Sequence, residues 1–179
     1  MPSQSRTICA AVMLAAIIAT PLQGQAPAKQ PDPMVATIQM GAAHIRAMFT
    51  TAAEQMSEAD YAFRPTAEVR TFGQLLAHVA ETNYYFCSAA TGEKAPVTGI
   101  DTAKATKADV QKALAESLDY CDRAFASMND ETNAKALRKF RDRPMPALPL
   151  LNFRNYHSLL HWGNAITYMR LRGKVPPAA

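Results

Sequence analysis

The stretch HSLLHWGNAITYMRLRG, residues 157–173, decides how this chain folds, because it carries a long helical pattern to a clear stop. The helix that contains it is expected over about residues 148–171, and Gly173 with the prolines that follow ends it. His157 and His161 are four residues apart, so both imidazoles lie on one helix face, one turn apart. Such a pair can bind a metal ion, or it can be ordinary packing beside a tryptophan.

Three more helices are expected upstream of this stretch. Residues 34–56 place methionine and isoleucine side chains on one face at spacings of three, four and seven. A second helix begins at a capping-box pattern, Thr71 with Gln74, and ends at Gly92. A third has a similar start and covers about residues 106–128. Four helices of this length bury one shared core, which predicts an all-α four-helix bundle.

The segments between these helices lack a helical period. Residues 57–70 are expected to form a loop, since Pro65 biases the residue before it away from helical angles. Residues 129–147 are polar and then rich in proline, which predicts a loop with at most one short helical turn. No β-type alternation, internal repeat or glycine-rich phosphate loop is evident in the sequence.

Length and composition limit the class of protein. A chain of 179 residues, 49% of them hydrophobic, fits one domain with a single core. A formal charge of +4 and an isoelectric point near 9.1 describe a mildly basic protein without the dense charge of an obligate nucleic-acid binder. The basic run KALRKFRDR, residues 135–143, is expected to be a solvated segment between helices, so no nucleic-acid partner is predicted.

The first 26 residues have the anatomy of an export signal. Arg6 lies in a short leader, and an apolar stretch follows over residues 8–19. That stretch is too short for a stable anchor, and small and polar residues follow it without a charged stop, although an uncleaved membrane helix is the alternative. We therefore expect an exported protein, periplasmic or secreted, with no stable membrane span after signal removal. Its expected parts are a signal and cleavage region at 1–26, a flexible leader at 27–33 and a bundle domain at 34–177.

Export leaves Cys87 and Cys121 in an oxidising compartment, where a pair of cysteines favours a disulfide; two free buried thiols are the alternative. Each cysteine lies roughly 23 Å from the start of its own helix at about 1.5 Å per residue. If they are bonded, equal heights make the two helices parallel, and the connection between them is long enough to run back along a helix. The four helices then run up, down, down and up, with one long crossover connection.

A metal site needs a third donor, because a stable mononuclear site usually has three protein ligands and a catalytic one keeps a position for water. His78 is the best candidate, since it lies beside Leu75 and Val79 at the margin of the apolar face of the second helix. A hydrogen-bonded carboxylate would also satisfy a buried histidine. On spacing alone, hydrogen-bonded core or surface histidines therefore remain the alternative.

Two segments carry a resemblance to a known family: DYAFRPTAEVRTFGQLLAHVAETNYYFCSAATG at residues 60–92, and HSLLHWGNAITYMRLRGKVPP at residues 157–177. Together they resemble the DinB-like four-helix-bundle family of metal-dependent enzymes, and the similarity covers about residues 34–177. In that family one histidine on the second helix and an HxxxH pair on the last helix form a metal triad. The resemblance implies the same crossover topology and assigns the triad to His78, His157 and His161.

The resemblance implies one divalent metal ion, and three imidazoles suit zinc, nickel, iron and manganese alike. The sequence departs from the family beside the last histidine. Many relatives have a polar or acidic residue before it and an Arg-Gly-Gln-like continuation, whereas Leu160 precedes it here and Trp162, Gly163 and Asn164 follow. The three ligands are kept, so the departure concerns the residues that support them and contact a substrate.

Four further residues are candidates near this centre. Glu81, three residues beyond His78, could orient an imidazole or act as the catalytic base, and a solvated carboxylate is the alternative. His44 on the first helix could approach the same point or lie at the helix edge. Asn164 and Tyr168 share the face of His157 and His161 and could line a pocket, with core packing as the alternative for Tyr168.

Three functions are compatible with these features. The first is a metal-dependent hydrolase or thiol-transferase acting on a small molecule, an activity that the resemblance implies and the sequence does not specify. The second is a noncatalytic bundle that binds a metal or a small ligand, and the third is a metal-free bundle with hydrogen-bonded histidines. A homodimer is compatible with each of them. The substrate and the reaction cannot be predicted from the sequence.

Overall fold

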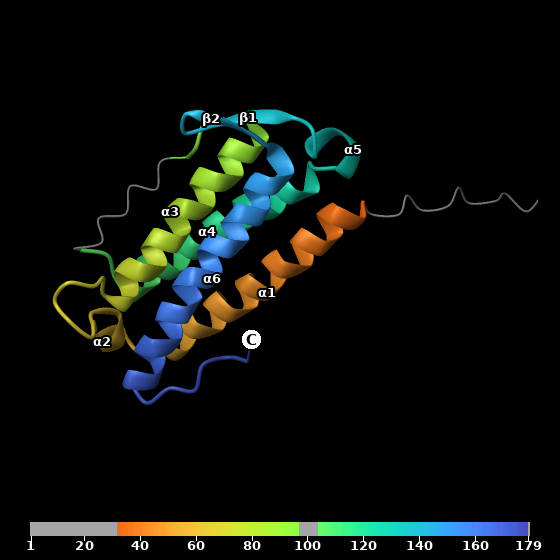
Figure 1. Cartoon of the computed structure of the whole chain (residues 1–179). Helices are drawn as coiled ribbons and strands as arrows, with labels where there is room; N and C mark the ends of the chain where they lie inside the picture. The colour runs from red at the N-terminus through yellow and green to blue at the C-terminus, as the bar shows by residue number, and fades with distance from the viewer. Residues whose placement is uncertain (1–31, 97–103, 179) are drawn as a thin grey trace, which may run out of the picture. The chain divides into compact units, whose positions relative to one another are not determined.

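The computed structural model describes residues 32–96 and 104–178. Its four long helices are α1 (Pro33–Gln55), α3 (Phe72–Thr91), α4 (Lys107–Ala126) and α6 (Ala147–Leu171). The shorter elements are the helices α2 (Glu58–Tyr61) and α5 (Asp130–Asn133) and the strands β1 (Leu137–Phe140) and β2 (Arg143–Pro146) (Figure 1). The expected export signal lies outside the described residues, as does most of the expected leader. No helix in the described ranges is long and apolar enough to cross a membrane.

Local capping contacts fix where α3 begins and ends. The hydroxyl of Thr71 accepts a hydrogen bond from the backbone N–H of Gln74, whose side chain accepts one from the Thr71 N–H in return. Both donors would otherwise lack partners in the first turn of α3. Gly92 ends the same helix with a φ of +82°, a conformation that glycine adopts without a steric penalty. The helix boundaries predicted from these signals are confirmed to within about two residues.

The helices α3 and α4 run parallel. The amide of Asn83 donates a hydrogen bond of 3.0 Å to the hydroxyl of Ser117. One turn further along both helices, Cys87 and Cys121 form a disulfide, with 5.4 Å between their Cα atoms. Residue numbers therefore increase in the same direction on both helices. This parallel arrangement is the one expected from the heights of the two cysteines, and residues 97–103 of the connection lie outside the described residues.

The pairs α3–α6 and α1–α4 are antiparallel. The ring of Phe72, at the start of α3, packs against Tyr168 near the end of α6, while Phe86 near the end of α3 packs against Phe153 near the start of α6. Two contacts show the direction of α1 against α4. The first is the ion pair of Arg46 with Asp119.

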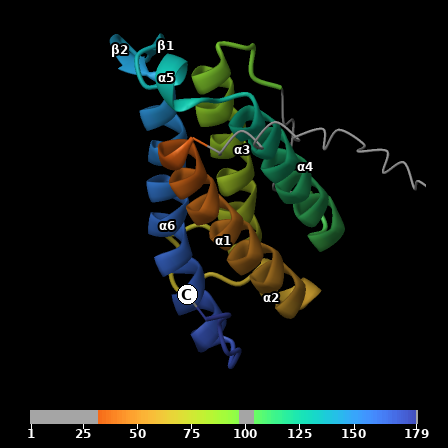
Figure 2. The ribbon, with the colours of Figure 1, turned by 90° about the vertical axis from the view of Figure 1, so that its right-hand side faces the viewer.

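The second contact between α1 and α4 is the hydrogen bond of 3.1 Å from the Gln111 amide to the Ala53 carbonyl. As Ala53 follows Arg46 while Gln111 precedes Asp119, α1 and α4 run in opposite directions. The order up, down, down, up is confirmed, and Figure 2 shows α1 lying across the side formed by α4 and α6.

The prediction of a loop over residues 129–147 is wrong in part. The expected helical turn is present as α5, but β1 and β2 form an antiparallel hairpin with Leu137 opposite Pro146. It lies across the end of the bundle where α3 ends and α6 begins (Figure 1). Phe140 anchors it, because its ring stacks on Phe86 with centroids 5.6 Å apart. Four-residue strands with one buried side chain leave too little alternation to be recognised in the sequence.

A second short helix corrects the prediction of an unbroken loop at residues 57–70. In α2 the hydroxyl of Ser57 accepts from the backbone N–H of Asp60, and the Asp60 carboxylate accepts from the Ser57 N–H at 3.0 Å. The remaining loop, residues 62–70, leads directly into α3.

A buried polar contact fixes α6 against α3 near the predicted ligands. Arg154 is 1% exposed, and its Nε donates a hydrogen bond of 2.7 Å to the side-chain oxygen of Asn83. Its Nη1 donates a second bond, of 3.1 Å, to the side chain of Asn155. Burial lowers the pKa of Arg154 to about 10, so the guanidinium remains charged at neutral pH. Since Arg154 lies one turn before His157, this contact sets how α6 presents its histidines to α3.

Candidate metal centre

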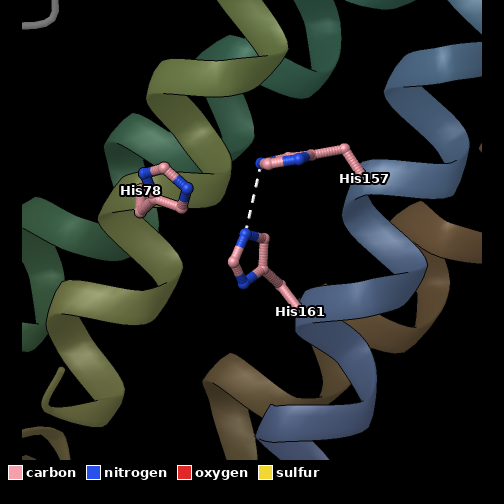
Figure 3. Close-up of side chains that lie close together, drawn as sticks. All are labelled: His78, His157 and His161. Atoms are coloured by element: carbon pink, nitrogen blue, oxygen red, sulfur yellow. Dashed lines mark hydrogen bonds between the residues drawn. The ribbon is translucent and has the colours of Figure 1, made fainter. Parts of the chain in front are cut away.

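Three histidines converge between α3 and α6. His78 extends from α3 toward α6, while His157 and His161 extend from consecutive turns of α6 toward α3 (Figure 3). The ring centroid of His78 lies 5.4 Å from that of His157 and 4.7 Å from that of His161, and the latter two are 4.6 Å apart. Two helices running in opposite directions thus bring together residues that are 79 and 83 positions apart in the sequence. The predicted convergence is confirmed.

The ring nitrogens have the spacing of a metal site. The Nε2 atoms of His157 and His161 are 3.2 Å apart, and one nitrogen from each of the three rings lies within 4.8 Å of the others. Tetrahedral coordination with metal–nitrogen bonds of about 2.0–2.1 Å places ligand nitrogens about 3.3 Å from each other. The pair on α6 already has that separation. Closing the triad around an ion requires shifts of about 1.5 Å or less, which side-chain rotation can supply.

The surroundings keep the three imidazoles neutral. The pKa of His161 is lowered to about 4, chiefly by burial and also by the neighbouring His157, His78 and Arg70. Burial followed by the charge of Arg70 also lowers the pKa of His78 and of His157. At neutral pH each ring therefore has a free nitrogen lone pair, the form that binds a metal ion.

One buried atom of the cluster has no protein partner. Within the described ranges, Nδ1 of His161 is buried and makes no hydrogen bond. A buried polar nitrogen without a partner costs about 1–3 kcal/mol, but this atom is not the His161 nitrogen that faces His157, which is Nε2. The donor set of three imidazoles fits a metal ion held through Nε2 of His157 and His161, and Nδ1 of His161 would still need a partner of its own. The structure contains no carboxylate that accepts a hydrogen bond from these rings among the described residues, and the usual support for ligating histidines is therefore lacking there.

A surface cavity of about 690 Å³ lies beside the cluster. His161 forms part of its wall, together with Asn164 and Tyr168 from α6 and with the loop that leads into α3. This volume is within the range of small-molecule sites. Asn164 and Tyr168 both line this cavity, as the sequence allowed, and Tyr168 also packs in the core, with 6% of its surface exposed.

The loop that forms the opposite wall is held to α6 at both ends. The hydroxyl of Tyr168 donates a hydrogen bond of 2.6 Å to the backbone carbonyl of Arg70. Before the loop, Asp60 pairs with Arg172, whose Nε lies 2.6 Å from the carboxylate. The cavity wall over residues 62–70 is therefore tied to the same helix that carries two of the histidines.

The other two candidates lie apart from the cluster. Glu81 is exposed on α3, it is not among the residues that line the cavity, and no contact joins it to a histidine ring in the part of the chain that the structure describes. The prediction of Glu81 as catalytic base gains no support from the geometry. His44 is exposed on α1 and does not belong to the histidine cluster.

The sequence analysis missed Arg70 as a residue of the site. It lines the cavity with His161, and its charge acts on all three histidines. The sequence shows that Arg70 immediately precedes Thr71, the N-cap of the helix that carries His78, but not that it faces the cavity. A residue at that position is fixed at the start of the ligand-bearing helix, about two turns before His78.

The comparisons with known proteins agree with the fold. The family model of the DinB superfamily matches residues 41–165. The chain therefore belongs to the DinB superfamily.

Two solved structures share the fold. A DinB-like protein from Bacillus subtilis is 17% identical, with a TM-score of 0.65 over 79% of this chain and 96% of that one. A DinB-like protein from Bacillus cereus ATCC 10987 is 14% identical, with a TM-score of 0.67 over 79% of this chain and 95% of that one. At these identities the likeness concerns the fold alone. No curated protein matches the chain significantly.

Proposed function

We propose that this protein is an exported metalloprotein that binds one divalent ion through His78, His157 and His161 and acts on a small molecule as a hydrolase or transferase. The observation that carries the proposal is the convergence of three neutral imidazoles, each with a nitrogen within 4.8 Å of the others, at the wall of a cavity. When bound, such an ion lowers the pKa of a coordinated water or thiol and so supplies a nucleophile near neutral pH.

The disulfide supports the location. Disulfides persist mainly in oxidising compartments, and Cys87 of α3 is bonded to Cys121 of α4. This agrees with removal of an export signal at residues 1–26 and with a functional domain at residues 34–177. The export signal, those boundaries and the absence of a nucleic-acid partner are part of the proposal.

Metal analysis of the purified mature protein tests the site. We expect about one divalent ion per chain in the wild type and a loss of at least tenfold in metal affinity for His161→Ala. His44→Ala is the matched control, because it removes an exposed histidine outside the cluster and should leave the metal content unchanged. A wild-type protein that takes up no ion, or an equal loss in both variants, would contradict the proposal.

A noncatalytic metal-binding bundle is the second candidate, and the exposed position of Glu81 outside the cavity favours it. The two differ in whether the ion has an exchangeable position. Cobalt-substituted protein should change its visible spectrum on addition of azide if that position faces the cavity. A spectrum insensitive to azide would indicate a sealed, structural ion.

A further inference from the structure

The charged side chains that line the cavity beside His161 differ in whether they have an interaction partner. Two charged residues line it, Glu68 and Arg70. The pKa of the Glu68 carboxyl is lowered by hydrogen bonding to Thr66 and to the Glu68 backbone and by the charge of Arg64, so this carboxylate is stabilised by groups next to it in the chain. The side chain of Arg70 is exposed, and among the described residues it has no hydrogen-bond acceptor and no carboxylate within ion-pair distance. The guanidinium is therefore the unpaired charge of this cavity.

The main chain of Arg70 is fixed although its side chain is free. Its carbonyl accepts the 2.6 Å hydrogen bond from Tyr168, and the next residue, Thr71, is locked in the capping box of α3. The Cα atom of Arg70 therefore has a set position relative to both helices of the histidine cluster. A long side chain on a fixed stem can reach over a ligand in the cavity with little movement of the backbone.

A cation at this position does not help to bind a metal. Arg70 and a divalent ion repel each other, and the charge of Arg70 already disfavours protonation of all three histidines. A group with negative charge placed between them would be attracted by both. The planar guanidinium also presents paired N–H donors that match the two oxygens of a carboxylate or a phosphate.

We propose that Arg70 determines the specificity of the cavity and that its ligands carry an oxyanion group, a carboxylate or a phosphate, which binds between Arg70 and His161. This inference rests on the proposed function, because it places the rest of the ligand at the metal centre. The anionic group contributes to binding and does not react. Arg70 thus selects among small molecules that the histidine site alone would accept equally.

Pairs of small hydroxamates, which bind divalent metals, test the charge preference. The probes are succinic acid monohydroxamate, with a carboxylate tail, its phosphonate analogue 3-phosphonopropionohydroxamate, and the uncharged butyrohydroxamate. Each is titrated by calorimetry into zinc-loaded wild type, Arg70→Gln and Arg143→Gln. The last variant is the charge-matched control, since Arg143 is exposed on the hairpin and does not line this cavity.

We expect Arg70→Gln to weaken binding of at least one anionic probe by about tenfold. This is the lower end of the range for a hydrogen bond to a charged group, because the site is open to solvent. Binding of butyrohydroxamate and the zinc content should change by less than about twofold, and Arg143→Gln should behave as the wild type. Whichever tail responds more strongly identifies the carboxylate or the phosphate as the preferred group.

Two results would overturn the inference in distinguishable ways. If zinc-loaded wild type binds charged and uncharged probes equally, or if Arg70→Gln and Arg143→Gln weaken the anionic probes equally, the specificity assigned to Arg70 is wrong while the metal site stands. If the wild type takes up no zinc, the proposed function fails and the inference fails with it.

Discussion

Breaking the disulfide between Cys87 and Cys121 should destabilise the bundle by an amount that the chain topology predicts. The bond closes a loop of 34 residues, and restricting a loop of this length in the unfolded chain stabilises the native state by about 4 kcal/mol at 25 °C. For a domain of this size each kcal/mol shifts the melting temperature by about 2–4 °C. We therefore expect the reduced protein to melt about 8–16 °C below the oxidised protein.

The comparison needs no substitution. The protein is unfolded in urea, reduced, and refolded with and without reductant, and the free energy of unfolding is then measured by urea titration. Reduction must begin from the unfolded state, because both cysteines are completely buried in the native one. The double variant Cys87→Ala/Cys121→Ala is the control, since its stability should not respond to reductant.

A difference below about 1 kcal/mol between the oxidised and reduced proteins would refute this reasoning. It would mean that α3 and α4 keep their parallel arrangement in the unfolded chain, or that the native bond is opposed by strain. Metal uptake by the reduced, folded protein should be retained, because the contact of Arg154 with Asn83 fixes α3 and α6 without the disulfide.

Two further predictions concern pH and the cavity wall. Metal binding should persist at pH 5.5, where histidines of ordinary pKa are mostly protonated, because burial and neighbouring positive charge lower the pKa of all three ligands, that of His161 to about 4. Metal content after dialysis at graded pH measures this, and half-loss near pH 6.5 would contradict it. For Asp60, burial raises the pKa, but hydrogen bonds from Ser57 and Arg172 outweigh burial and bring it to about 2. A carboxylate with a lowered pKa stabilises the fold above its ordinary pKa of 3.8, and this contribution is lost as the pH falls toward 2. Asp60→Asn should therefore lower the free energy of unfolding by about 1–3 kcal/mol at pH 7 and by much less at pH 2. Urea titration at each pH measures this, and an equal loss at both would show that the charge is not responsible.

The local signals in the sequence were sufficient for the four long helices. Thr71 with Gln74 and Thr106 with Asp109 form the capping boxes that begin α3 and α4, and Gly92 ends α3 in the left-handed conformation. These are contacts between residues a few positions apart, so their geometry follows from the order of the amino acids alone.

The hairpin and the cavity wall depend on contacts that a local pattern does not contain. Phe140 is buried because Phe86 and Phe153 of two different helices offer it a surface, and nothing next to it in the sequence indicates that surface. Arg70 belongs to the site because Tyr168, 98 residues away, binds its carbonyl.

The order of residues by itself determined the helices, their apolar faces and the placement of His157 and His161 one turn apart, because helical periodicity converts spacing directly into direction. Only the tertiary structure decided that His78 lies close enough to complete the cluster, that Glu81 faces solvent instead, and that Arg70 faces the cavity. The physical reason is that distance between helices is set by how buried side chains such as Arg154 and the Cys87–Cys121 pair pack together. That packing is a property of the whole core and not of any one segment.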